Sequence, residues 1–114
     1  MADGDKVTTN PEFGQWLLLD ANDATGTGNG VWVDTGVYRM DGVLEVNGIA
    51  GGTVLTISGS NDDTIPANSA HGTSLGTISA DSVQSLAVCR FMKARVSTLG
   101  TGTVSARLTA SRGF

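Results

Sequence analysis

The stretch FMKARVSTLGTGTVSARLTA, residues 91–110, decides the fold class of this 114-residue chain. Apolar and polar residues alternate from Met92 to Val96 and again from Val104 to Ala110. A period of two residues is typical of a strand with one face on a core and the other in solvent. Leu99–Gly102 lies between the two alternating segments and predicts a hairpin turn that pairs them.

Strand character extends outward from this stretch to most of the chain. Val43–Ile49 alternates in the same way, and Ala50–Gly52 after it predicts a second hairpin turn. Residues 81–90 stay open between a helical turn and an extended segment that leads into the next strand. Further strands are predicted at residues 16–19, 31–35, 53–58 and 75–78.

The composition supports an all-β chain. Gly occurs 16 times, Thr 14 times and Ser 10 times, whereas Glu and Lys, which favour helices, occur twice each. About eight short strands at regular spacing predict an antiparallel β-sandwich that is jelly-roll-like, although an immunoglobulin-like order gives the same pattern. We expect an extended N-terminal arm over residues 1–15 and the sandwich domain over residues 16–114.

Charge is distributed unevenly along the chain. Residues 1–63 carry ten acidic and two basic residues, a balance of −8, and residues 64–114 carry five basic residues and one acidic residue, a balance of +4. The acidic first half disfavours nucleic acid and anionic membranes as partners, because both require concentrated basic charge. The start of the chain lacks the features of a signal peptide, so synthesis in a cytosol is expected.

The residue types that usually carry catalysis are scarce. His71 is the only histidine and Cys89 the only cysteine, and we expect a solvated loop histidine and a buried structural cysteine. The loop Asp20–Gly30 has several side-chain oxygens but fails the EF-hand spacing, so we expect a turn there rather than a calcium site. The sequence therefore predicts no enzyme, no metal and no cofactor.

Two groups of residues could bind a partner. A sugar-stacking platform could be formed by Trp16, Trp32, Tyr38 and Phe91, although aromatic residues in strands more often pack in a core. If residues 91–110 form a hairpin, then Lys93, Arg95 and Arg107 share its polar face, where they could dock against an acidic neighbour. The alternative is that these cations pair with acidic residues of the same chain.

Four segments occur in an order that resembles a known class of protein. They are Leu44–Gly48 (LEVNG), Gly52–Asp63 (GTVLTISGSNDD), Arg90–Val96 (RFMKARV) and Gly102–Leu108 (GTVSARL). This order resembles small β-sandwich proteins of tailed bacteriophage virions, and more distantly the discoidin-like jelly roll. The chain departs from the discoidin pattern because it lacks the two cysteines and the aromatic residue expected after the GSNDD segment.

The resemblance implies a capsid cement, or decoration, protein on the outside of an icosahedral phage head. Such a protein would bind the major capsid protein at junctions between capsomers and would itself form a dimer or trimer. The expected contacts are Pro11, Phe13 and Trp16 of the arm region, together with Lys93, Arg95 and Arg107. The alternative implied by the same resemblance is a tail-fibre or baseplate module that recognises a host-surface glycan through Trp32, Tyr38 and the loop at residues 20–30.

Overall fold

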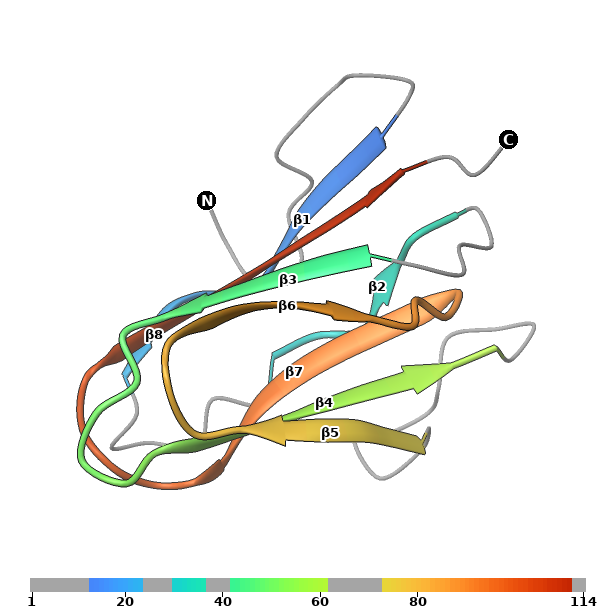
Figure 1. Ribbon diagram of the computed structural model, residues 1–114. Coiled ribbons are helices and arrows are strands. Elements are labelled where there is room, and N and C mark those ends of the chain that lie inside the picture. Colours follow the sequence, from blue (N-terminus) through green and yellow to red (C-terminus); the bar gives the residue numbers. More distant parts are fainter. Residues whose placement is uncertain (1–12, 24–29, 37–41, 62–72, 112–114) are drawn as a thin grey trace.

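Eight strands follow one another along the part of the chain that the computed structural model describes, residues 13–23, 30–36, 42–61 and 73–111, with the side chains of residues 13, 21–23 and 111 excepted (Figure 1). The strands are β1 (Phe13–Asp23), β2 (Val33–Asp34), β3 (Gly42–Asn47), β4 (Val54–Ser60), β5 (Thr73–Ile78), β6 (Ser82–Leu86), β7 (Phe91–Thr98) and β8 (Thr103–Ser111). The expectation of an all-β chain with about eight strands is confirmed. The open choice at residues 81–90 is resolved in favour of extended structure, because β6 lies there.

The strands form two antiparallel four-stranded sheets. Sheet A has the order β1-β8-β3-β6 and sheet B the order β2-β7-β4-β5. The first strand therefore pairs with the last, the second with the seventh, the third with the sixth and the fourth with the fifth. This strand order is that of an eight-stranded jelly roll and differs from that of an immunoglobulin-like sandwich.

Both predicted hairpins are wrong. β7 belongs to sheet B and β8 to sheet A, and in the same way β3 and β4 lie in opposite sheets. The turns at residues 50–52 and 99–102 therefore carry the chain from one sheet to the other. The turn residues are compatible both with a hairpin within one sheet and with a crossing between sheets. The partner of each strand therefore depends on the topology of the whole chain.

These two crossings lie side by side and are bonded to each other. Ala50 and Thr101 form an isolated antiparallel bridge, in which the Thr101 amide donates to the Ala50 carbonyl at 3.1 Å. The Thr53 hydroxyl, which is fully buried, lies 2.7 Å from the Ala50 carbonyl oxygen and 3.0 Å from that of Thr101. The Thr53 hydroxyl therefore lies within hydrogen-bonding distance of one carbonyl oxygen from each crossing.

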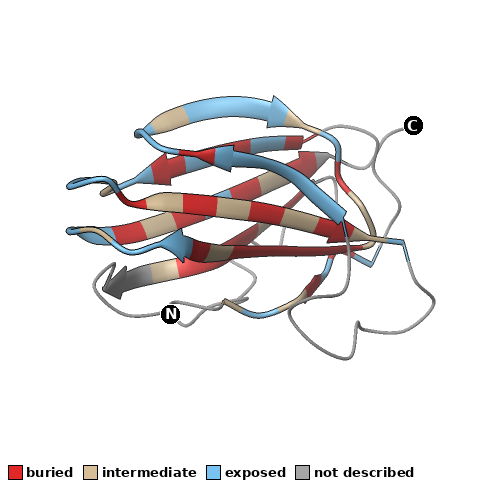
Figure 2. Ribbon diagram, turned by 90° about the horizontal axis from the view of Figure 1, so that it is seen from below, coloured by how far each residue is buried: buried red, intermediate tan, exposed pale blue. Residues whose placement is uncertain are grey.

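The core lies between the sheets and follows the alternation of the strands (Figure 2). β3 alternates strictly between buried and exposed residues, and β4 alternates between buried and half-buried residues. In β7 and β8 the apolar positions predicted to face inward are all buried in one cluster. They are Met92, Ala94, Val96, Val104, Ala106, Leu108 and Ala110.

β1 is longer at both ends than the sequence predicted. Phe13, Gly14 and Gln15 of the expected arm already pair with β8, opposite Ser111, Ala110 and Thr109. At the other end, residues 20–23 of the expected loop continue the strand, with register shifts that absorb the poor strand formers. Pairing with the long strand β8 outweighs the weak local propensity of these residues.

Candidate functional site

The middle of β7 presents two cations on the outer face of sheet B. Met92, Ala94 and Val96 face the core, so Lys93 and Arg95 between them point to the opposite side. β7 lies between β2 and β4, which places these side chains near the middle of the sheet. The predicted outward orientation of Lys93 and Arg95 is confirmed.

Lys93 is unusual because it is buried although it lies on an outer face. Only 6% of its surface is exposed, and its Nζ atom lies 5.8 Å from the centroid of the Trp32 ring. A cation over an aromatic face is attracted by the ring quadrupole. Burial lowers the pKa of Lys93, and the nearby positive charge of Arg95 lowers it further. Lys93 therefore lies where an added negative charge would be favourable.

The strand beside these cations carries hydroxyl groups. Ser58 of β4 is the register partner of Lys93, and Thr56 is the partner of Arg95. On β5, the residues opposite Thr56 and Ser58 are Thr77 and Ser74. Within the strands described, no acidic residue is the register partner of either cation. We call Trp32, Thr56, Ser58, Lys93 and Arg95 the cationic face.

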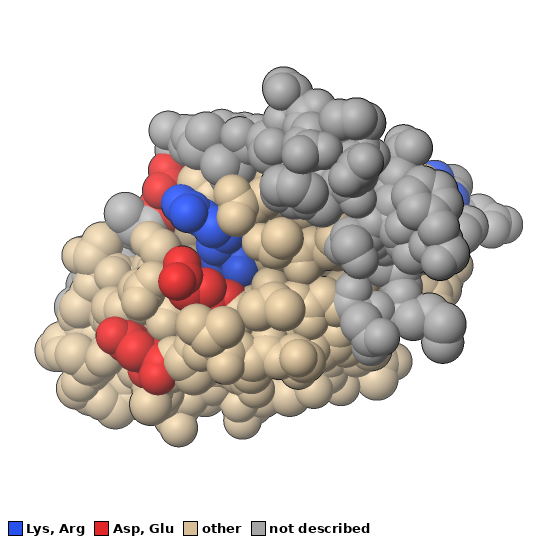
Figure 3. Space-filling model, turned by 45° about the horizontal axis from the view of Figure 1, so that its top comes forward, with Lys and Arg blue, Asp and Glu red and all other residues tan. Residues whose placement is uncertain are grey.

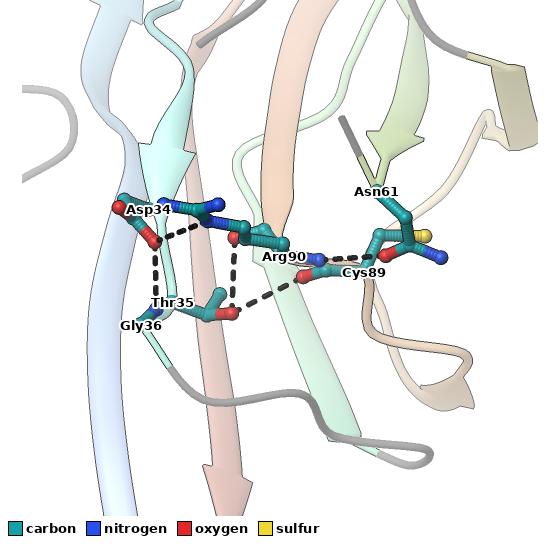
Figure 4. Close-up of polar contacts among 6 residues, drawn as sticks. All are labelled: Asp34, Thr35, Gly36, Asn61, Cys89 and Arg90. Atoms are coloured by element: carbon teal, nitrogen blue, oxygen red, sulfur yellow. Dashed lines mark hydrogen bonds and ion pairs between the residues drawn. The ribbon is translucent and has the colours of Figure 1, made fainter. Parts of the chain in front are cut away.

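A polar network fixes the beginning of β7 (Figure 4). Arg90 Nε lies 3.7 Å from Asp34 Oδ1, and the same carboxylate oxygen accepts the Gly36 amide at 2.8 Å. The backbone amide of Arg90 donates to Asn61 Oδ1 at 3.0 Å, and the Arg90 guanidinium lies 4.9 Å from the centre of the Phe91 ring. Residues from the ends of β2 and β4 thus converge on the residue that precedes β7.

Thr35 completes this network from the end of β2. Its amide donates to the Arg90 carbonyl at 2.8 Å, and its hydroxyl lies 3.0 Å from that oxygen and 3.1 Å from the carbonyl oxygen of Cys89. Thr35 is buried, with 5% of its surface exposed. The network therefore positions the backbone from which Lys93 and Arg95 project, and we assign it a structural role.

Arg107 lies on the other side of the molecule. It projects from β8 on the outer face of sheet A, where Glu45 of β3 is its register partner. Both residues line a shallow hollow together with Gln15 and Thr109, which are joined by a 3.1 Å hydrogen bond. In Figure 3 the central group of basic atoms lies beside acidic ones. The predicted patch of three cations on one face is therefore wrong, because it depended on a β7–β8 hairpin.

The three predicted contacts near the N-terminus have different positions. Pro11 lies outside the described residues. Phe13 is the first residue of β1 and pairs with Ser111. Trp16 belongs to the core, with 6% of its surface exposed, and an added Cβ at Gly14 would collide with its ring. Trp16 is thus a packing residue that anchors β1 rather than part of a free arm.

The residues considered for chemistry gain no support from their surroundings. Burial raises the pKa of the Cys89 thiol, which disfavours the reactive thiolate, and Cys89 packs against the core cluster. An added Cβ at Gly59 would lie 2.7 Å from its Sγ atom, so a glycine in β4 makes room for the sulfur. Among the described residues no group of three or more His, Cys, Asp and Glu side chains could hold a metal ion. His71 and Tyr38 lie outside the described residues.

Sequence reasoning missed the burial of Lys93 and its contact with Trp32. Trp32 precedes a two-residue strand, and only the pairing of Val33 with Met92 brings it beside β7. The available signal was that Lys93 lies between the core residues Met92 and Ala94 of one strand. This alternation predicts that the lysine side chain points away from the core, but it does not predict that neighbouring residues bury it.

Neither the protein-family models nor the curated protein sequences contain a match to this chain. Within the described segments, no helix is present that is long and apolar enough to cross a bilayer.

Proposed function

We propose that this chain is a non-enzymatic structural protein of a tailed-phage virion, a decoration protein that binds the outer surface of the head and stabilises it. The proposal rests on the order of the four segments noted in the sequence and on one observation. The cationic face holds Lys93, buried and without an acidic register partner, beside Arg95. A surface of this kind favours a partner that brings carboxylates.

The mechanism requires no chemistry at the site. A protein that binds the assembled shell and not its separate subunits stabilises the shell by mass action. Acidic side chains of neighbouring capsid proteins would pair with Arg95, and the charge of the buried Lys93 beside it would add to the attraction. Thr56 and Ser58 would supply hydroxyl groups for the remaining carboxylate oxygens. Bound at a junction between capsomers, each copy would hold neighbouring capsid proteins together against the pressure of the packaged DNA.

Binding to heads stripped of this protein tests the proposal. Purified protein is mixed with stripped mature heads over a range of concentrations, the heads are sedimented, and the bound protein is counted per major capsid protein. We expect saturation at a fixed ratio and a higher melting temperature of the decorated shell. A folded protein that sediments with no head, at any concentration below aggregation, would exclude the decoration role.

A second candidate function is suggested by the contact between Trp32 and Lys93. An aromatic ring beside a cation and several hydroxyl groups can bind an acidic sugar, as a tail-fibre or baseplate module would. The half-buried Trp32 side chain is the residue on which such binding would depend. Saturable binding of host-surface glycan that is lost in Trp32→Ala, with no binding to heads, would favour this function over the first.

A further inference from the structure

One side of the sandwich is open, and it is formed by the two edge strands β5 and β6 (Figure 2). Residues 73–77 of β5 and residues 83–85 of β6 are all exposed. Between these strands an apolar hollow reaches toward the core, lined by Leu44, Ile57, Leu75, Gly76, Ile78, Gln84 and Leu86. Val83 of β6 is 65% exposed, more than any other large hydrophobic residue described.

The edges on this side lack the usual protection. A free strand edge is a template for pairing with another chain, and proteins protect such edges with charged residues, proline or bulges. The opposite edges carry Asp20 in β1 and Asp34 in β2. By contrast, β5 (TSLGTI) and β6 (SVQSL) contain neither a charged residue nor proline.

β6 is the more regular of the two edges. Its five residues pair with five consecutive residues of β3 without a register shift. The pairing of β5 with β4 is interrupted by a shift between Ile57 and Ser58, near Gly76, whose φ is +145°. A bulge blunts an edge, so β5 is partly protected and β6 is not.

We propose that β6 pairs antiparallel with β6 of a second copy of this chain, which joins the two A sheets into one continuous sheet. An antiparallel strand is complementary to itself across a two-fold axis, because each free amide then meets a free carbonyl. The chain as a whole has a net charge of −4, but the neutral β6 brings no like charges together at the axis. This inference is independent of the proposed binding to a phage head.

The length of β6 fixes the register of this pairing. Only with Gln84 opposite Gln84 of the second copy do all five residues of each strand find a partner. Val83 then lies opposite Ser85 of the second copy, so that the exposed valine gains a neighbour on the outer face of the joined sheet. The same approach brings a second copy over the open side on which Leu75 is 37% exposed.

Sedimentation velocity over a range of concentrations tests the pairing. We expect the wild-type protein to dimerise, and Gln84→Lys to raise the dimer dissociation constant about tenfold or more, because two lysines then face each other at the axis. Val43→Lys is the control: it adds the same charge at an exposed position of sheet A, but on β3, one strand inside the edge. This control should leave the dimer intact.

A charge exchange separates loss of pairing from loss of folding. Mixing Gln84→Lys with Gln84→Glu should restore the dimerisation that each substitution alone weakens, because opposite charges then meet at the axis. A monomeric or trimeric wild-type protein would overturn the proposal. It would also be overturned by a dimer that resists Gln84→Lys and dissociates in Val43→Lys, since the copies would then meet through the sheet face.

Discussion

At the scale of single residues, Thr53 shows how one polar group joins the two crossings between the sheets. Its hydroxyl lies within hydrogen-bonding distance of the carbonyl oxygens of Ala50 and Thr101, and it is fully buried. The Ala50 carbonyl also accepts the backbone amides of Thr53 and Thr101. The Thr53 hydroxyl therefore adds a side-chain hydrogen bond to the backbone bonds that join the two crossings.

Thr53→Val keeps the shape of the side chain and removes the hydroxyl. We expect it to lower the free energy of unfolding by about 1 kcal/mol, because the hydrogen bond of the Thr53 hydroxyl is lost while the Ala50 carbonyl keeps its two amide donors. Urea unfolding measures this loss. Thr103→Val, at an exposed position of β8, is the control and should change the stability by less than about 0.5 kcal/mol. Equal losses in the two variants would show that the Thr53 hydroxyl has no special role.

Lys93 makes the free energy of unfolding depend on pH in a predictable direction. Burial lowers the pKa of this ammonium group below its ordinary value of 10.5, so the folded chain binds fewer protons than the unfolded chain between the two pKa values. The contribution of Lys93 to stability therefore rises with pH across that window. In Lys93→Met this contribution is absent, whereas all other titrating groups are the same.

The difference in unfolding free energy between the wild type and Lys93→Met should consequently shift in favour of the wild type from about pH 7 to about pH 10. Urea titrations of both proteins at each pH measure it. Parallel pH profiles for the two proteins would mean that the Lys93 ammonium is solvated in the folded state.

At the scale of elements, alternation predicted the faces of the strands but not their partners. In β3, β7 and β8 the period of two residues correctly placed the apolar side chains that face the core, but it did not predict that Lys93 on the other face of β7 is buried. The turns at residues 50–52 and 99–102 contain the glycines of a hairpin, yet both cross between the sheets. Pairing depends on strands far apart in the sequence, such as β1 with β8, and no local signal contains that information.

The candidate site follows the same division. The outward direction of Lys93 and Arg95 depends on β7 alone and was predictable, whereas the position of Arg107 relative to them depends on pairing and was not. The crossing at residues 48–52 also imposes a backbone requirement that the glycine pattern only hints at. Gly48 and Gly52 have similar positive φ values, +89° and +86°.

Replacement by alanine should lower the stability by different amounts at these two glycines. An added Cβ at Gly48 would collide with the backbone carbonyl oxygen of Thr103 in β8, whereas nothing lies within 4 Å of one at Gly52. Gly52→Ala should cost about 1–2 kcal/mol from backbone strain alone. Gly48→Ala should cost more, because a paired strand must also shift. Denaturant midpoints of the two variants provide the comparison, and similar midpoints would contradict the close approach of residue 48 to β8.

At the scale of the whole molecule, the two outer faces differ in charge balance. Sheet A has Arg107 opposite Glu45, so its cation faces an acidic residue of the same chain. Sheet B has Lys93 and Arg95 opposite hydroxyl residues. The second face is thus the one on which the proposed function depends, and residues before β1 are the second region expected to contact a shell.

Truncation tests the contribution of the N-terminal region. Deleting residues 1–12 leaves all of β1 in the chain and should weaken binding to heads. Deleting residues 1–15 should also lower the melting temperature, because it removes three residues that pair with β8 and the Gln15–Thr109 hydrogen bond. If the shorter deletion binds heads as the full chain does, the N-terminal region makes no contact.

The most direct test of the cationic face compares Arg95→Glu with Arg107→Glu in the sedimentation assay with stripped heads. Both variants reverse one charge at a strand position on an outer face, so they have the same net charge. We expect Arg95→Glu to weaken binding by about tenfold or more, with a loss that shrinks at high salt, and Arg107→Glu to bind as the wild type does. Equal binding by all three proteins, or a loss confined to Arg107→Glu, would contradict docking through sheet B.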